Sequence, residues 1–283
     1  MKLSDISLKL GRLPFQGGCF CGKTGVHGIK VVILAGGRGS RLSEETDIKP
    51  KPMVEIGGRP ILWHIMKIYA RHGITDFIIC LGYMGERIKD YFYNYNLYSS
   101  DITVDLRAGM TIHQSQAEDW RVTLVETGLT TQTGGRLKRI RKYLGTDKLF
   151  CMTYGDAVAD IDITSEIAFH QSHGKRATVA AVRPLARFGA LHIEGDHVTR
   201  FEEKPEHEAG LISGGFFVLD TETIGLVEDD ATLWEKTPME SLARQGQLRA
   251  YKHTGFWQPM DTLRDRLALE QLCLSGQAPW ITW

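Results

Sequence analysis

A short apolar run that stops at a glycine-rich segment constrains the fold of this chain more than any other feature. The run Lys30-Val-Val-Ile-Leu-Ala35 is followed directly by Gly36-Gly-Arg-Gly-Ser-Arg41. A run of this length that is rich in Val, Ile and Leu predicts a buried strand, and closely spaced glycines predict a turn after it. The sequence therefore predicts a strand whose carboxyl end opens into a loop lined by backbone N–H groups.

Strand-like and helix-like segments alternate along the chain after this loop. The expected strands cover residues 74–81, 149–154, 177–182, 192–201 and 214–219, and the expected helices cover 60–72, 86–95, 163–172 and 263–274. This order is typical of parallel strands joined by helical crossovers. We expect 192–201 and 214–219 to extend the sheet as a mixed part. The prediction is an α/β fold, a single Rossmann-like three-layer domain with a mixed, mostly parallel sheet and small β and helical additions.

Residues 1–28 differ from the rest of the chain. Frequent glycines and a lack of periodicity predict an N-terminal extension that is poorly ordered, and no signal peptide is recognisable in it. No internal repeat or linker follows Gly28, so we expect residues 29–283 to form one domain.

Charge and composition exclude several classes of protein. The chain has 34 Lys and Arg against 34 Asp and Glu, so no net field attracts nucleic acid or an anionic membrane. No apolar run approaches the ~20 residues that a membrane helix needs. Five cysteines, an odd number spread over 283 residues, do not form a disulfide framework. We therefore expect a cytoplasmic protein with no nucleic-acid or membrane partner.

The glycine loop fits neither a dinucleotide fingerprint nor a P-loop. Leu42 stands where the fingerprint needs a third glycine, and the Gly-Lys-Ser/Thr ending of a P-loop is missing. What remains is Gly-Gly-x-Gly-x-Arg after a strand, a pattern that lets N–H groups approach an anion beside a fixed cation. The alternative is an ordinary turn between a strand and a helix.

A basic segment, Lys49-Pro-Lys-Pro-Met53, follows the loop. Each lysine precedes a proline and is biased to extended backbone, and alternation along such backbone would place both ammonium groups on one side. Together with the glycine loop, the two lysines predict a clamp for a triphosphate. The alternative is a solvated basic loop.

The segments Leu34–Leu42 and Lys49–Met53 together resemble the signature of the sugar-phosphate nucleotidyltransferases. Within that family, further blocks are most similar to the glucose-1-phosphate cytidylyltransferases. These blocks are Leu42–Thr46, Met53–Gly58, Pro60–Met66, Thr133–Lys138, Tyr154–Asp156, Arg187–Leu191, Gly214–Phe217 and Gly255–Arg264. The resemblance runs from Ile29 nearly to Trp283 and implies that residues 29–283 form a nucleotidyltransferase catalytic domain.

The resemblance implies an activity and its partners. CTP would transfer its cytidylyl group to α-D-glucose 1-phosphate, giving CDP-glucose and pyrophosphate, with Mg²⁺ as the cofactor. CDP-glucose would feed the synthesis of sugars for O-antigen and other cell-surface polysaccharide. The family also implies a homo-oligomer, expected to be a hexamer, in which Tyr91–Tyr98 and Trp120 could cover a subunit contact.

The resemblance also implies site residues. Those that would bind the nucleotide are Leu34, Gly36, Gly37, Gly39, Ser40, Arg41, Lys51, Thr131, Gly135, Arg136 and Gly155, with Thr131, Gly135 and Arg136 at the base. Those that would bind the sugar phosphate are Lys204, Gly214 and Gly215, beside Ser213 where the family has Asn. Asp156 and Asp261 would hold the metal, and Arg41, Lys51 and Lys204 are the expected catalytic residues.

Other roles remain open for several of these residues when each is considered alone. Asp156 also fits a turn after Gly155, Asp261 fits a helix N-cap, and Lys204 fits a solvated charge run. Arg136 also fits a contact with phosphate or a cap on the following helix.

Competing functions remain open as well. The competing activities are a thymidylyl- or uridylyltransferase on the same fold, a regulatory module that binds nucleotide sugars without turnover and, more distantly, a dinucleotide-dependent oxidoreductase.

Overall fold

The computed structural model describes residues 28–39, 42, 46, 48–184, 190–194, 196–202 and 210–283, with the backbone alone for 190–194, 201 and 202. All of the predicted N-terminal extension except Gly28 therefore lies outside the described residues. Among the described residues, no helix is both long and apolar enough to cross a membrane.

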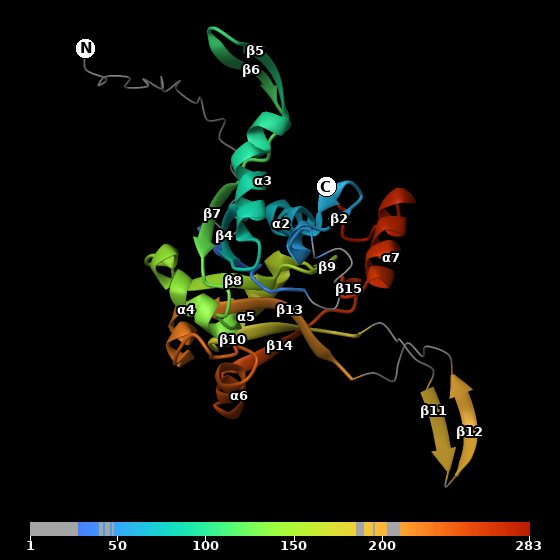
Figure 1. The fold of residues 1–283 in the computed structure, drawn as a ribbon. Helices are drawn as coiled ribbons and strands as arrows, with labels where there is room; N and C mark the ends of the chain where they lie inside the picture. The colour runs from blue at the N-terminus through green and yellow to red at the C-terminus, as the bar shows by residue number, and fades with distance from the viewer. Residues whose placement is uncertain are drawn as a thin grey trace.

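A seven-stranded sheet forms the centre of the molecule (Figure 1). Its strands, in spatial order, are β14 (Leu248–Lys252), β10 (Ala177–Val182), β13 (Ile212–Asp220), β8 (Leu149–Tyr154), β1 (Lys30–Leu34), β4 (Asp76–Leu81) and β7 (Arg121–Glu126). β8, β1, β4 and β7 are mutually parallel, and β13 is antiparallel to both of its neighbours. The carboxyl ends of four parallel strands therefore meet at one edge of the sheet.

Helices cover both faces of this sheet and make three layers. Alternate residues of β1 show why, because Val31 and Ile33 face one buried core whereas Val32 and Leu34 face the other. The first core packs against α2 (Ile61–Arg71), α3 (Gly85–Tyr98), α5 (Ile163–His173) and α7 (Leu263–Leu274), and the second packs against α4 (Thr133–Leu144), η3 (Thr221–Leu226) and α6 (Thr237–Arg244). Strands buried on both faces read as continuous apolar runs, which is the pattern of the sequence.

Four short two-stranded sheets accompany the central one. They pair β2 (Glu55–Ile56) with β3 (Arg59–Pro60), β5 (Ser100–Asp105) with β6 (Gly109–Ser115), β9 (Ala157–Ala159) with β15 (Trp257–Pro259), and β11 (Ala190–Glu194) with β12 (His197–Glu202). The β5–β6 hairpin projects beyond the end of α3 (Figure 1).

The predicted fold class is confirmed, and one detail is wrong. The segment 192–201 was expected to extend the central sheet, but β11 and β12 pair only with each other among the described strands. Only 214–219 joins the sheet as an antiparallel element, β13. A local sequence pattern indicates a strand but does not specify its partner, which explains the error.

Candidate active site

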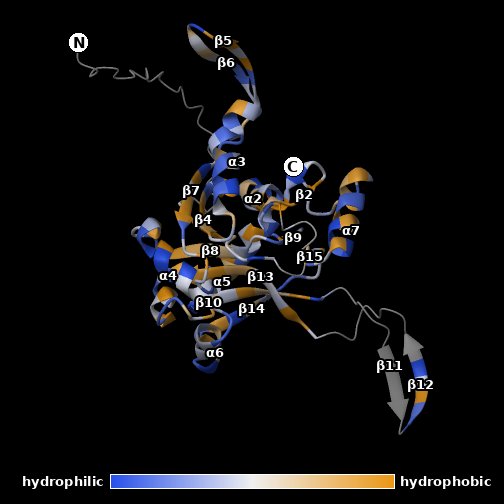
Figure 2. Cartoon of the chain, in the orientation of Figure 1, coloured by the Kyte–Doolittle hydropathy of each residue, from blue (hydrophilic) through white to orange (hydrophobic). Residues whose placement is uncertain are grey.

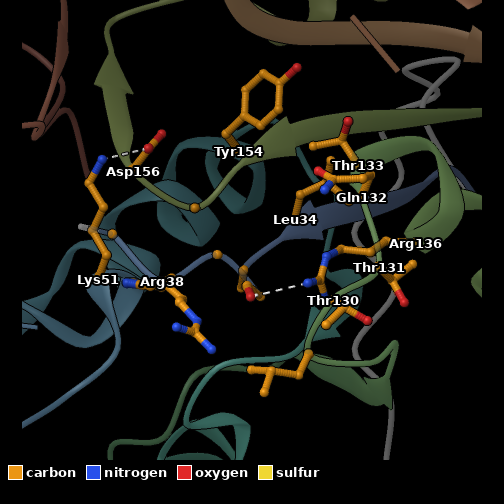
Figure 3. Close-up of a pocket in the computed structure, with 17 residues that line it drawn as sticks. Leu34, Arg38, Lys51, Thr130, Thr131, Gln132, Thr133, Arg136, Tyr154 and Asp156 are labelled. Carbon is orange, nitrogen blue, oxygen red and sulfur yellow. Dashed lines mark hydrogen bonds and ion pairs between the residues drawn. The ribbon is translucent and has the colours of Figure 1, made fainter. Parts of the chain in front are cut away.

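A pocket of about 570 Å³ opens at the edge where the parallel strands end. The carboxyl ends of β1 and β8 line it with the residues that follow them, 34–39 and 154–156. The segment 129–133 after β7 also lines it, together with Lys51, Pro52 and Arg136 (Figure 3). Open α/β sheets bind ligands at the carboxyl ends of their strands. The volume lies within the range of ordinary ligand pockets.

The glycine loop is packed so closely that side chains would not fit at two positions. A Cβ built on Gly36 would lie 2.1 Å from Nη1 of Arg136, and one built on Gly39 would lie 3.0 Å from Cβ of Lys51. Gly39 also has a φ of +63°, which glycine adopts without strain. Gly37 is exposed and has open space around it. The loop thus covers Arg136 and the stem of Lys51 with bare backbone.

Arg136 lies beneath this loop and is only 5% exposed. Its Nη1 donates to the carbonyl of Leu81 at 2.8 Å and to Oγ1 of Thr127 at 2.6 Å. Its Nη2 donates to the carbonyl of Gly36 at 3.2 Å, the bond that Figure 3 shows. One guanidinium therefore ties together the last residue of β4 and the segments that follow β1 and β7. Burial lowers the pKa of Arg136, although an arginine stays protonated at neutral pH.

Arg136 has no carboxylate partner among the described residues, so its positive charge remains beneath the loop. Anion binding by the loop would be favoured by this charge. Its observed hydrogen bonds show that it holds these segments of the pocket together. Arg136 lies within α4, whose N-cap is Gln132, so it does not cap this helix.

Lys51 lies between two carboxylates and is 8% exposed. Its Nζ is 2.7 Å from Oδ2 of Asp156 and 2.8 Å from Oδ1 of Asp261 (Figure 3 shows the first pair). Burial lowers the pKa of Lys51, but the two carboxylates outweigh burial, and the net result is a pKa above the usual value. The two oxygens converge on a single cation, which here is the ammonium group.

The strand pair β9–β15 explains why Asp156 and Asp261 lie together although 105 residues separate them. Asp156 precedes β9 and Asp261 follows β15; Ala157 pairs with Pro259, and the N–H of Met260 donates to the carbonyl of Asp156 at 2.8 Å. Asp261 is not the N-cap of α7, because Thr262 holds that position in a capping box with Asp265. The N-cap alternative for Asp261 is therefore wrong.

Lys49, the other lysine of the predicted clamp, does not join Lys51 at Asp156 and Asp261. Lys49 is half-exposed, and its Nζ is 3.4 Å from Oε1 of Glu55. Lys51 begins a 3-10 turn, η2 (Lys51–Met53), rather than continuing an extended segment. Alternation therefore does not apply, and the prediction that both ammonium groups share one side is wrong.

Gly214 and Gly215 lie in β13 beside Tyr154. A Cβ on Gly215 would lie 2.6 Å from Cδ2 of the Tyr154 ring, and the φ of Gly215 is +80°. The carbonyl of Gly214 accepts from Nε1 of Trp257 at 2.8 Å. The two glycines thus let two aromatic side chains approach the backbone closely.

Sequence reasoning missed a hydrogen-bonded group centred on Glu235. This carboxylate accepts from the hydroxyl of Tyr154 and, at 2.6 Å, from the hydroxyl of Thr133. Burial followed by the charge of Glu235 raises the pKa of Tyr154, so the phenol stays neutral. Thr133 lay inside a recognised block, but no local signal could have connected it with a residue about a hundred positions later.

Most of the described residues predicted to bind the nucleotide line the pocket, and Gly135 does not. The pocket lining includes Leu34, Gly36, Gly37, Gly39, Lys51, Thr131, Arg136, Gly155 and Asp156. Gly135 instead packs on the backbone of Asp230: a Cβ built on Gly135 would lie 2.6 Å from Cα of Asp230. Ser40, Arg41 and Lys204 lie outside the described residues. Arg38, Thr130, Gln132, Thr133 and Tyr154 also line the pocket and were not predicted.

Comparison with known proteins defines the family. The family model described as "Nucleotidyl transferase" matches residues 30–258. The chain therefore belongs to the nucleotidyl transferase family. It is 57% identical over 256 residues to a glucose-1-phosphate cytidylyltransferase of Salmonella typhi, which covers 90% of this chain and 100% of that protein. It is 42% identical, with the same coverage, to a probable glucose-1-phosphate cytidylyltransferase of Bacillus subtilis strain 168.

A solved structure supports the fold independently. HddC from Yersinia pseudotuberculosis superimposes with a TM-score of 0.64 at 24% sequence identity, covering 88% of this chain and 99% of that one. This likeness concerns the fold alone. Together with the sequence relatives, it confirms the predicted α/β architecture and the predicted resemblance.

Proposed function

We propose that this protein is an enzyme that transfers the cytidylyl group of CTP to α-D-glucose 1-phosphate and releases pyrophosphate, with CDP-glucose as the product. The observation that carries the proposal is the identity of 57% over the full length of a relative named for this activity. The pocket supports it, because a glycine loop, a buried arginine and the Lys51–Asp156–Asp261 cluster surround a space of about 570 Å³.

The reaction is an in-line substitution at the α-phosphorus of CTP. An oxygen of the sugar phosphate forms the new P–O bond as the bond to the leaving pyrophosphate breaks. The attacking phosphate is already an oxyanion at neutral pH, so the protein has to align the two substrates and neutralise negative charge. The N–H groups of Gly36, Gly37 and Gly39 and the ammonium of Lys51 would hold the phosphates of CTP.

Three expected contributors complete this proposal although the structure does not describe them. Ser40 and Arg41 would extend the phosphate contacts of the glycine loop, and Lys204 would bind the phosphate of the sugar. Gly214 and Gly215 would face the hexose. Arg41, Lys51 and Lys204 together would supply positive charge on both sides of the reacting phosphorus.

Family membership implies a divalent metal ion, and the donor set fits one. The carboxylate oxygens of Asp156 and Asp261 converge on one cation position, as their distances to the Lys51 ammonium show. Among the described residues, no group of three or more His, Cys, Asp or Glu is arranged for a metal. Two carboxylates suit Mg²⁺, which keeps several waters and takes further oxygens from phosphate. Bound there, the metal would neutralise charge that develops on the phosphates.

Base recognition is proposed to involve Thr131 and Arg136, with Gly135 fixing the start of α4. Thr131 and Arg136 line the pocket, and Gly135 packs the first turn of α4 against Asp230. Close packing of Gly135 on Asp230 would hold the start of α4 in place beside the pocket.

Release of pyrophosphate tests the activity and the base together. The purified protein is incubated with Mg²⁺ and glucose 1-phosphate, and CTP, UTP, dTTP, ATP and GTP are compared side by side. Strong preference for CTP supports the proposal. Preference for dTTP or UTP would contradict the base assignment, and no release with any nucleotide would contradict the enzymatic function.

We further propose that the protein forms a homo-oligomer, with a hexamer as the expected order. The β5–β6 hairpin supports this, because Ile102, Val104, Met110 and Ile112 are exposed in it and the pairing register places Ile102 opposite Ile112 and Val104 opposite Met110. A two-stranded hairpin with an uncovered apolar face is marginally stable alone. A second copy of the chain is the proposed cover, and the mass of the native protein in solution tests the proposal.

A cytoplasmic location completes the proposal. Cys80, Cys151 and Cys273 are free thiols in the described structure, which suits a reducing compartment. The same compartment supplies CTP and sugar phosphates.

A further inference from the structure

The stem of Lys51 is held firmly, but its charged end can reach more than one partner. Its Cβ lies beneath the glycine loop, where a Cβ built on Gly39 would meet it at 3.0 Å. The backbone of η2 is closed by a hydrogen bond of 2.7 Å from the N–H of Met53 to the carbonyl of Pro50. Four rotatable side-chain bonds separate this anchored backbone from the ammonium group. The side chain lines the pocket proposed for the triphosphate and ends at the carboxylates.

The ammonium group and a metal ion would compete for the same two oxygens. Nζ of Lys51 lies 2.7 Å and 2.8 Å from Oδ2 of Asp156 and Oδ1 of Asp261. A Mg²⁺ bound by both oxygens would stand about 2.1 Å from each, and therefore very near the present position of Nζ. Two cations at such a separation repel each other strongly in a partly buried site. Occupation by the metal requires the ammonium group to leave.

We propose that Lys51 is an internal counter-ion that keeps divalent metal out of the nucleotide-free enzyme and moves onto the phosphates when nucleotide binds. This inference rests on the metal and triphosphate positions of the proposed function. The triphosphate offers the ammonium group new oxygens, and departure of the ammonium group lets the two carboxylates take the metal. Metal binding and nucleotide binding are therefore coupled, and thermodynamic reciprocity makes each favour the other.

Binding of Mn²⁺ to the nucleotide-free protein tests this coupling directly. Free Mn²⁺ is measured by its electron paramagnetic resonance signal during titration of the wild type and of Lys51→Met, which keeps the length of the stem and removes the charge. We expect the variant to bind Mn²⁺ about tenfold more tightly than the wild type, because a like charge beside the metal site is removed. Lys51→Gln is the second variant. Its amide can still donate a hydrogen bond to one carboxylate, so the measurement can be made even if Lys51→Met does not fold.

Two controls make the measurement specific. Lys49→Met removes an ammonium group two residues away that pairs with the exposed Glu55, and it should leave the Mn²⁺ affinity unchanged. The double variant Lys51→Met/Asp261→Asn should lose the gained affinity, because one of the two carboxylates that would hold the metal becomes an uncharged amide.

The coupling itself is measured by repeating the titrations with CTP present. In the wild type, CTP should raise the Mn²⁺ affinity of the protein, and in Lys51→Met this increase should be much smaller. Equal Mn²⁺ affinities for the wild type and both Lys51 variants without nucleotide would overturn the inference. That result can be distinguished from failure of the proposed function, which appears as a wild type that releases no pyrophosphate.

Discussion

Glu166 is a carboxyl group buried in the first core at 1% exposure. Its Oε1 has no hydrogen-bond partner among the described residues. Burial raises the pKa of Glu166 from 4.5 to about 8, so the group is largely protonated at neutral pH in the folded protein. Between these two values the folded protein binds more protons than the unfolded chain. The free energy of unfolding therefore falls as pH rises from about 4.5 to about 8.

The variant Glu166→Gln should remove this pH dependence. It keeps the size of the side chain and cannot ionise, so its stability relative to the wild type should rise by on the order of 3 kcal/mol between about pH 5 and about pH 8.5. Urea unfolding of both proteins at the two pH values measures the difference. If the variant and the wild type differed in stability by the same amount at both pH values, the pKa of Glu166 would not be raised by folding.

Gly36 offers a second prediction at the scale of one residue. A methyl group at this position would lie 2.1 Å from Nη1 of Arg136, so Gly36→Ala must displace the guanidinium from the carbonyls of Gly36 and Leu81. Leaving such buried groups unpaired costs about 1 to 3 kcal/mol each. We expect a lower unfolding midpoint for Gly36→Ala. Gly37→Ala is the matched control for stability, because its added carbon meets nothing within 4 Å.

At the scale of elements, the start of α7 determines how Asp261 is presented. The carboxylate of Asp265 accepts from the N–H groups of Asp261 at 3.2 Å and Thr262 at 2.9 Å, and the N–H of Asp265 donates to Oγ1 of Thr262 at 3.2 Å. This capping box stabilises the helix and also fixes the backbone of the residue that precedes it.

Loss of the cap should therefore affect both stability and metal use. Thr262→Ala should lower the free energy of unfolding by about 1 kcal/mol, and it should raise the Mg²⁺ concentration needed for half-maximal pyrophosphate release. Thr262→Ser retains the hydroxyl and should behave like the wild type. An unchanged Mg²⁺ requirement in Thr262→Ala would show that Asp261 is held by other contacts.

The elements predicted from sequence differ in how well they match the structure, and the reason is physical. The segments 149–154, 177–182 and 263–274 coincide with β8, β10 and α7, because apolar periodicity and end signals are local in the sequence. The partner of β11 and the contact of Glu235 with Thr133 and Tyr154 are not local. The 3-10 turn at Lys51 escaped prediction because proline restricts the preceding residue without defining the turn.

At the scale of the whole molecule, the glycine loop and the lysine could be predicted as phosphate-binding candidates, but their relation could not. The alternation of strands and helices predicts that the loop after β1 lies at the carboxyl edge. Only the folded chain shows that Lys51 crosses beneath this loop to reach Asp156 and Asp261. The register of β9 with β15 joins these two aspartates, and no local sequence pattern specifies a pairing between segments about a hundred residues apart.

Two surfaces of the molecule carry the proposed contact between copies. The exposed apolar face of the β5–β6 hairpin projects away from the body (Figures 1 and 2). A groove of about 730 Å³ lies near the base of the hairpin, between α3 and the edge strand β7, and is lined by Phe92, Tyr93, Tyr95, Trp120, Val122 and Leu124 among others. Because the hairpin extends away from its own groove, a second copy is needed to bring the two surfaces together.

The proposed oligomer predicts that charge placed on the apolar face of the hairpin separates the copies. The double variant Ile102→Asp/Ile112→Asp should reduce the native mass measured by light scattering after gel filtration, because carboxylates would be buried without partners in the contact. Thr111→Asp is the matched control on the same hairpin, since the register pairs Thr103 with Thr111 on the opposite face, and it should keep the wild-type mass. A wild type that is already monomeric would contradict the proposed oligomer, whereas an unchanged mass in the isoleucine variant would place the contact elsewhere on the molecule.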